Sequence, residues 1–310
     1  MSRKNRQKLY WLLFLFVSAF VLLGGGHRPV LAQHPPDLDE DIPWIPTEWW
    51  QVTPAEIERA FNNARQTENQ QLGSSLPPIQ FPAAATWSGW DDNQKALFLI
   101  NEERTARELA PLEIAPEATE VATNYASWLI AHDAWGHEAD VDDDGQTETP
   151  WDRLEANKTI QACHDLLRVA ENLAVYVSSS ADHLPDEATA RAIYDWLYAD
   201  ASAAWGHRHT LLWAEFTETP AGTDVVGRFG VSLQTAAGYQ GPFSESWPSA
   251  SLVVYNVYDP CDEADLAASP ATTNPTPTAE NSLLSQVIVG GALLLVVMGG
   301  LILRRQTGPG

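Results

Sequence analysis

The 310-residue chain carries 18 basic and 41 acidic residues, a formal net charge of −23. Residues 33–282 alone hold 11 basic and 41 acidic residues, so this part of the chain has a net charge of −30. Such an acidic surface repels phosphate backbones and anionic headgroups, which excludes a nucleic-acid-binding function. The 45% hydrophobic residues and 13 tryptophans suffice for a packed core.

The N-terminus, residues 1–32, is typical of a secretory signal peptide. Four basic residues between positions 3 and 8 precede an apolar run over 9–23, and small or modest residues follow at 30–32. An uncleaved N-terminal anchor is the alternative. Both interpretations predict that the bulk of the chain is exported.

A Trp-, Pro- and acid-rich extension is expected over residues 33–90. Trp44, Trp49 and Trp50 either pack the extension against the main domain or form an exposed aromatic strip. Within the extension, Thr53 as N-cap and Pro54 at the first helical position predict a helix over 54–71.

The main domain is expected over residues 91–262. Apolar spacing predicts helices over 91–109, 117–132 and 187–198, whereas β-branched and aromatic runs predict strands over 225–235 and 252–258. Helices come first and strands last, so the predicted fold class is α+β.

The C-terminal part reads as a membrane tether. Residues 263–282 form a Pro/Thr/Ser stalk, and 283–303 form an uncharged apolar run long enough to span a bilayer as a transmembrane helix. Arg304 and Arg305 then predict that the tail, 304–310, stays cytoplasmic. We therefore expect a single-pass cell-surface protein with an extracytoplasmic domain, and a disulfide between Cys163 and Cys261 because thiols in an exported region oxidise.

Four ordered motifs resemble the CAP superfamily of cysteine-rich secretory, antigen 5 and pathogenesis-related proteins, and its bacterial SCP-like branch in particular. The motifs are NEER at 101–104 with APL at 110–112, WGH at 135–137 followed by WDRL at 151–154, ENLA at 171–174, and GHRHTLL at 206–212 after Trp196. This resemblance implies an α-β-α sandwich with an antiparallel sheet.

The resemblance also implies a cleft lined by two histidines and two acids. Three of these fall on His137, Glu171 and His207, whereas the position of the fourth acid is Ala199. Asp195, one helical turn earlier, and Asp200, the next residue, are the candidate substitutes, and Asp195 is included in the expected cleft.

Two imidazoles and one carboxylate with an open position suit a labile, zinc-like site formed by His137, His207 and Glu171. Glu171 could instead lie outside the ligand shell, accepting an N–H from one imidazole and fixing its tautomer. A polar cluster that only braces a helix against the sheet is the third interpretation.

A second constellation suits weak calcium binding. Asp140, Asp142 and Asp144 followed by Gly145 match the first six positions of an EF-type loop, with Glu148 at position nine. Position twelve is Trp151, so the usual bidentate glutamate is absent. An acidic surface turn without an ion is the alternative.

The sequence favours a binding module over an enzyme, because the fourth acid is missing and the chain has neither a GxSxG nor an HExxH motif. The expected partner is a small molecule, a lipid, an envelope component or a divalent metal held in the His/Glu cleft. A metal- or His/Glu-dependent hydrolase and a structural or adhesive envelope protein stay open as alternatives.

Overall fold

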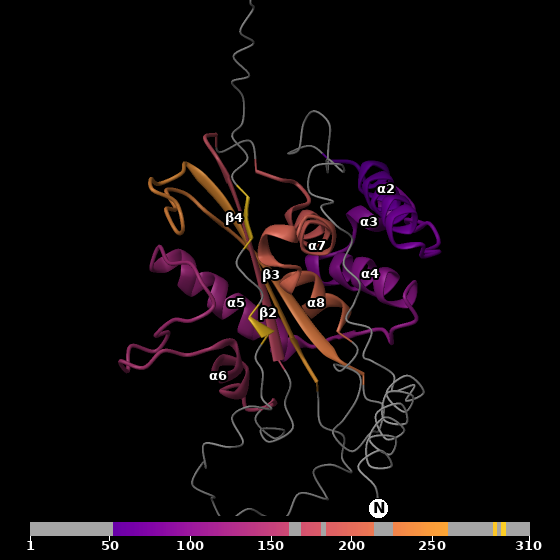
Figure 1. Cartoon of the computed structure of the whole chain (residues 1–310). Helices are drawn as coiled ribbons and strands as arrows, with labels where there is room; N and C mark the ends of the chain where they lie inside the picture. Colours follow the sequence, from indigo (N-terminus) through magenta and orange to yellow (C-terminus); the bar gives the residue numbers. More distant parts are fainter. Residues whose placement is uncertain are drawn as a thin grey trace, which may run out of the picture. The chain divides into compact units, whose positions relative to one another are not determined.

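The computed structural model describes residues 52–160, 169–180, 184–213, 226–259, 288–289 and 293–295 (Figure 1). The expected signal peptide, the extension before residue 52, both cysteines of the expected disulfide, the stalk and the tail lie outside these residues.

Three long strands form the middle of the sheet: β2 (Val169–Ser178), β3 (Arg228–Ala236) and β4 (Ser249–Tyr258). β4 pairs antiparallel with both of its neighbours, and the short β1 (Glu113–Ile114) adds to β3 in parallel. The expected antiparallel sheet is therefore correct for the long strands, while the complete sheet is mixed. Strand β2, which carries the ENLA motif, was not predicted, because it is buried along its whole length and lacks the alternation of a half-exposed strand.

Where the structure describes the C-terminal apolar run, it shows strands and not the expected transmembrane helix. Two short strands, β5 (Ile288–Val289) and β6 (Leu293–Leu295), pair in parallel with β2. Residues such as Ile, Val and Leu occur in edge strands as well as in helices, so an apolar composition does not decide between a strand and a helix. Among the described helices, none has the length and apolar character needed to cross a bilayer.

The helices begin close to the predicted positions because their caps are explicit in the sequence. Capping boxes start α2 with Thr53 and Glu56, α4 with Asp91 and Gln94, and α6 with Thr149 and Asp152. The helices are α2 (Pro54–Leu72), α3 (Ala84–Ser88), α4 (Asp92–Thr105), α5 (Pro116–Ala131), α6 (Pro150–Glu155), α7 (Ala188–Tyr198) and α8 (Gly206–Leu212), with a short 3-10 turn, η2 (Ala201–Ala203), before α8.

Helices cover both faces of the sheet, as the sandwich expectation requires (Figure 1). On one face, α5 packs against alternate residues of β2 such as Leu173 and Val175. On the other, α7 packs against the intervening residues, including Ala174 and Tyr176. At Gly230 of β3 an added Cβ would lie 2.0 Å from the backbone nitrogen of Thr119, so α5 can approach the sheet only over a glycine.

The described part of the extension is not separate from the domain. Ile57 and Phe61 of α2 and Trp87 of α3 are completely buried in the same apolar core as α7. The ring of Phe61 also meets Tyr194 and Tyr198 edge-on, at centroid distances of 5.4 and 6.0 Å. The structural domain therefore begins at α2, before the predicted boundary at residue 91.

Candidate functional site

The first histidine, His137, is held by Glu171 of β2. His137 lies in the loop between α5 and α6, and its Nδ1 donates to Glu171 Oε1 at 3.0 Å. Arg153 of α6 donates to both Glu171 oxygens at 2.9 Å and to the His137 carbonyl at 3.0 Å. The Arg153 guanidinium also lies 3.5 Å from the ring centroid of Tyr125. Glu171 is fully buried, so these contacts supply the compensation that its charge requires.

The second histidine, His207, is held by Asp200. Its Nδ1 lies 2.5 Å from Asp200 Oδ1, and the backbone N–H of Arg208 donates to Asp200 Oδ2 at 3.1 Å. Trp196 stacks on the imidazole, with 6.4 Å between ring centroids and 22° between planes. The first turn of α8 thus presents His207, while Asp200 orients it.

In both pairs the other ring nitrogen meets no hydrogen-bonding atom in the part of the chain that the structure describes. The Nε2 atoms of His137 and His207 are buried and have no hydrogen-bond partner among the described residues. Because a carboxylate accepts from Nδ1–H, each neutral imidazole keeps its lone pair on Nε2, the arrangement typical of a metal-ligating histidine. Buried polar atoms are rarely left unsatisfied, so these two point to a ligand, an ion or water.

The expected three-residue metal cluster does not assemble around Glu171. Glu171 and Asn172 are adjacent on β2, so their side chains lie on opposite faces of the sheet. Glu171 meets His137 on the α5 face, whereas Asn172 Nδ2 donates to the His207 carbonyl on the α7 face at 3.1 Å. Among the described residues, His137, Glu171 and His207 also do not form a group whose ligand atoms all lie within 4.8 Å of one another. Glu171 takes the orienting position that the sequence left as an alternative.

Asp195 does not belong to either histidine pair. Its Oδ2 accepts from Tyr176 Oη and from Arg191 Nε, both at 2.9 Å, in the packing between α7 and β2. Asp200 lies just after α7, where the chain leaves the helix and turns back toward α8, and this turn brings it to His207. The substitute for the missing fourth acid is therefore Asp200.

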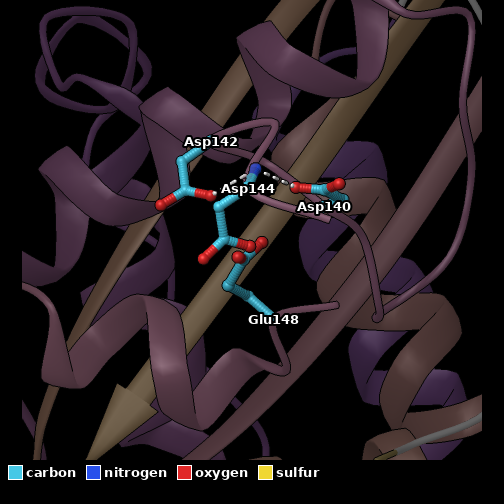
Figure 2. A group of neighbouring side chains, drawn as sticks. All are labelled: Asp140, Asp142, Asp144 and Glu148. Atoms are coloured by element: carbon cyan, nitrogen blue, oxygen red, sulfur yellow. Dashed lines mark hydrogen bonds between the residues drawn. The ribbon is translucent and has the colours of Figure 1, made fainter. Parts of the chain in front are cut away.

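The calcium candidate residues do come together. One carboxylate oxygen from each of four residues lies within 4.8 Å of the other three: these residues are Asp140, Asp142, Asp144 and Glu148 (Figure 2). Backbone N–H groups of the turn already hold the carboxylates: Asp144 N–H donates to Asp140 Oδ1 at 3.1 Å and to Asp142 Oδ1 at 3.2 Å. Gly145 supplies the left-handed conformation of the turn, with φ of +84°.

Among the described residues, no further carboxylate completes the loop in the usual way. Asp152, one residue past position twelve, caps α6 by accepting from the backbone N–H and the hydroxyl of Thr149 at 2.8 and 2.7 Å. Glu148 Oε2 accepts from the Val141 N–H at 2.6 Å. The loop therefore offers four carboxylates and no bidentate glutamate at its end.

Two residues of the His137 environment escaped prediction. Arg153 lies within the WDRL segment, but nothing in the sequence shows that its side chain neutralises Glu171. Asn256 lies directly opposite Glu171 in the β2–β4 register and is fully buried, and neither of its amide atoms has a partner among the described residues. An asparagine within an apolar strand gives no indication in the sequence that it lies beside Glu171.

An open groove of about 470 Å³ lies along α4, away from both histidines. Trp90, Leu97 and Phe98 form its apolar part, and the lining is completed by Gln94, Asn101, Glu102 and Thr105. The groove contains no histidine and no residue of the calcium loop.

Comparison with known proteins agrees with the motifs. Residues 97–222 match the model of the Cysteine-rich secretory protein family, CAP. Residues 97–222 therefore carry a CAP domain. A search of the curated proteins gives no match.

Solved structures of similar proteins include two bacterial ones. One is an extracellular protein containing a SCP domain from Bacillus anthracis, with 18% identity, a TM-score of 0.32, and coverage of 62% of this chain and 49% of that one. The other is the CAP domain of Enterococcal PrgA, with 16% identity, a TM-score of 0.34, and coverage of 74% of this chain and 87% of that one. The chain thus spans about half the length of the Bacillus protein.

Proposed function

We propose that this chain is an exported CAP domain whose two buried histidines, His137 and His207, each offer Nε2 to a small polar ligand or a divalent ion. The observation that carries the proposal is the shared arrangement of the two imidazoles. Each is buried, each has Nδ1 engaged by a carboxylate, and each has an Nε2 without a partner among the described residues.

The donor set fits zinc better than a hard cation. Imidazole nitrogens are zinc ligands, and an outer carboxylate on the other ring nitrogen increases their basicity. In this assignment Glu171 and Asp200 orient the imidazoles and make no bond to the ion. The chemistry that such an ion supplies is Lewis acidity, and this chain's contribution is to hold two neutral imidazoles in place.

The surroundings of His207 do not favour a hydrolase that uses a threonine as its nucleophile. Thr210 has the hydroxyl nearest in sequence to His207, and it contacts Asn172 Oδ1 and the His207 carbonyl rather than the imidazole. A nucleophilic hydroxyl would need to meet Nε2 of the imidazole that activates it.

Calcium binding by the loop over residues 140–148 is a second candidate function. The observation that favours it is that all four side chains at EF-type positions one, three, five and nine converge. With four carboxylates and no bidentate ligand, we expect an affinity in the range of extracellular modules, roughly 10⁻⁴–10⁻³ M.

Export and tethering complete the proposal, on the basis of the basic-apolar N-terminus and the apolar run over 283–303. For this run to enter a bilayer, its short strands β5 and β6 would have to leave β2. Protease added to intact cells should cut the 263–282 stalk and release the domain. A full-length protein that stays protected would contradict this topology.

Calorimetric zinc titration of the purified protein tests the main proposal. His137→Ala and His207→Ala should each weaken binding by at least tenfold, because each removes one imidazole nitrogen. His132→Ala is the matched control, since His132 is an exposed histidine that stacks on Trp128 at the end of α5. Equal affinities for all four proteins would contradict the proposal.

A further inference from the structure

Helix α2 lies entirely outside the residues that match the CAP family model, yet one of its side chains reaches the helix that carries His207. Glu68 is only 4% exposed. Its Oε1 accepts from Arg208 Nη2 at 2.8 Å and its Oε2 from Arg107 Nη2 at 2.7 Å. Glu68 therefore joins α2 to α8 through a buried ion pair and to Arg107, just after α4, through a partly buried one.

Arg208 is held both through its guanidinium group and through its backbone N–H. Besides the bond to Glu68, its Nη1 donates to the Leu197 carbonyl of α7 at 2.6 Å. Its backbone N–H donates to Asp200 Oδ2, while Asp200 Oδ1 holds His207 Nδ1. The position of the Arg208 backbone is thus linked directly to the carboxylate that orients the imidazole.

Helix α8 depends on such an anchor because its own start is weak. It has only seven residues, and its N-cap, Trp205, makes no side-chain capping bond. Ala204 and Trp205 both adopt left-handed backbone conformations, with φ of 52° and 64°. Such conformations cost non-glycine residues roughly 1–2 kcal/mol each, so contacts elsewhere must hold the turn in place.

We propose that Glu68 is a positioning residue of the His207 site, and that α2 is consequently a functional part of that site. Glu68 fixes Arg208, Arg208 fixes the first turn of α8, and this turn keeps Asp200 and His207 in contact. The inference rests on the proposed function only in taking His207 as a ligand-binding residue.

The His207 Nδ1–H proton signal in the metal-free, full-length protein tests this inference. A buried imidazole N–H bound to a carboxylate exchanges slowly and resonates at low field, and its loss in His207→Gln assigns it. We expect Glu68→Gln to abolish or shift this signal, because a neutral amide no longer neutralises Arg208.

Glu103→Gln is the matched control. Glu103 is a fully buried carboxylate of the same ion-pair network, but its partners are Arg65, Arg107 and Tyr198, not Arg208. Glu103→Gln should lower the free energy of unfolding comparably and leave the His207 signal in place. An unchanged signal in Glu68→Gln, or equal loss in both variants, would overturn the inference.

Arg208→Lys is the second variant, for use if Glu68→Gln does not fold. Lysine keeps the charge but cannot contact Glu68 and the Leu197 carbonyl with a planar fork, so we again expect loss of the signal. An intact signal in Arg208→Lys would contradict the proposal. Because all these spectra are recorded without metal, failure of zinc binding would leave their result unaffected.

Discussion

His207 Nδ1 lies 2.5 Å from Asp200 Oδ1, and His137 Nδ1 lies 3.0 Å from Glu171 Oε1, so the same histidine–carboxylate contact occurs twice around strand β2. In each pair the carboxylate is fully buried and also accepts a second N–H, from Arg208 in one case and Arg153 in the other. The site is therefore best described as two oriented imidazoles rather than a three-residue metal cluster.

Asp200→Asn should weaken zinc binding by roughly 10–100-fold, the usual effect of removing an outer carboxylate from a histidine ligand. Asp195→Asn is the comparison, because Asp195 contacts Tyr176 and Arg191 and should affect the free energy of unfolding but not the affinity. Calorimetry on both variants measures the two effects. A larger loss of affinity in Asp195→Asn would reverse the assignment of the fourth acid.

Glu171→Gln should destabilise the protein by roughly 3–5 kcal/mol, because it leaves the Arg153 guanidinium buried without a counter-charge. The double variant Glu171→Gln with Arg153→Met should recover part of this loss, since it removes the uncompensated charge. Urea unfolding of the single and double variants measures both free energies. A double variant less stable than the single one would show that Arg153 stabilises the domain independently of Glu171.

Calcium should raise the free energy of unfolding by about 1.4 kcal/mol when its concentration is ten times Kd. Asp144→Ala should abolish this stabilisation, because it removes one of the four converging side-chain ligands, whereas asparagine would keep a ligand oxygen. Asp143→Asn is the control: Asp143 lies between two cluster residues, has φ of 60°, and asparagine tolerates that conformation. Thermal melts of the parent protein and both variants, each with calcium and with a chelator, measure this effect. Equal shifts in melting temperature for all three proteins would argue against the site.

Acid should remove the stability that Glu103 contributes. Burial raises the pKa of Glu103, but the guanidinium groups of Arg107 and Arg65 outweigh this effect and leave the pKa below its ordinary value. The contribution is therefore complete above the unfolded pKa of about 4.5 and is lost as pH falls through the lower folded value. Glu103→Gln should show a smaller decline in unfolding free energy between pH 7 and acid than the parent protein; an identical slope would exclude Glu103 as its source.

Asn256→Leu should stabilise the protein by about 1–2 kcal/mol, because both amide atoms are buried without a partner among the described residues. Leucine keeps the branching of asparagine at Cγ and has no polar atoms to satisfy. If the amide instead holds a water or ligand beside Glu171, the substitution will destabilise the protein or weaken ligand binding. Urea unfolding combined with the zinc titration distinguishes these outcomes.

The parts of the fold that follow from local signals were predictable. Thr53 caps α2 in the structure as in the sequence analysis, and α4 and α5 begin within one residue of the predicted starts at 91 and 117. The end of α4 was placed too late, because Glu108 turns left-handed and the Leu109 N–H returns to the Arg104 carbonyl. Strand β2 was missed because a strand buried on both faces resembles any apolar run.

The sequence predicted which residues form the site, but not which of them contact one another. The motifs pointed to His137, Glu171 and His207, and the spacing of acids pointed to the calcium loop. The choice of Asp200 over Asp195 depends on how the chain turns after Tyr198, and the role of Arg153 depends on where α6 packs. Both are tertiary relationships, which helical periodicity cannot encode.

The measurement that tests the central claim most directly is the nitrogen spectrum of the histidine side chains, recorded without metal and again after adding zinc. The account predicts that His137 and His207 carry a proton on Nδ1 and show changed Nε2 resonances when zinc binds, while His132 does not respond. Adding acid should reverse the change, because a protonated Nε2 has no lone pair for the ion. Protons on Nε2 in the metal-free protein, or Nε2 resonances that zinc leaves unchanged, would contradict it.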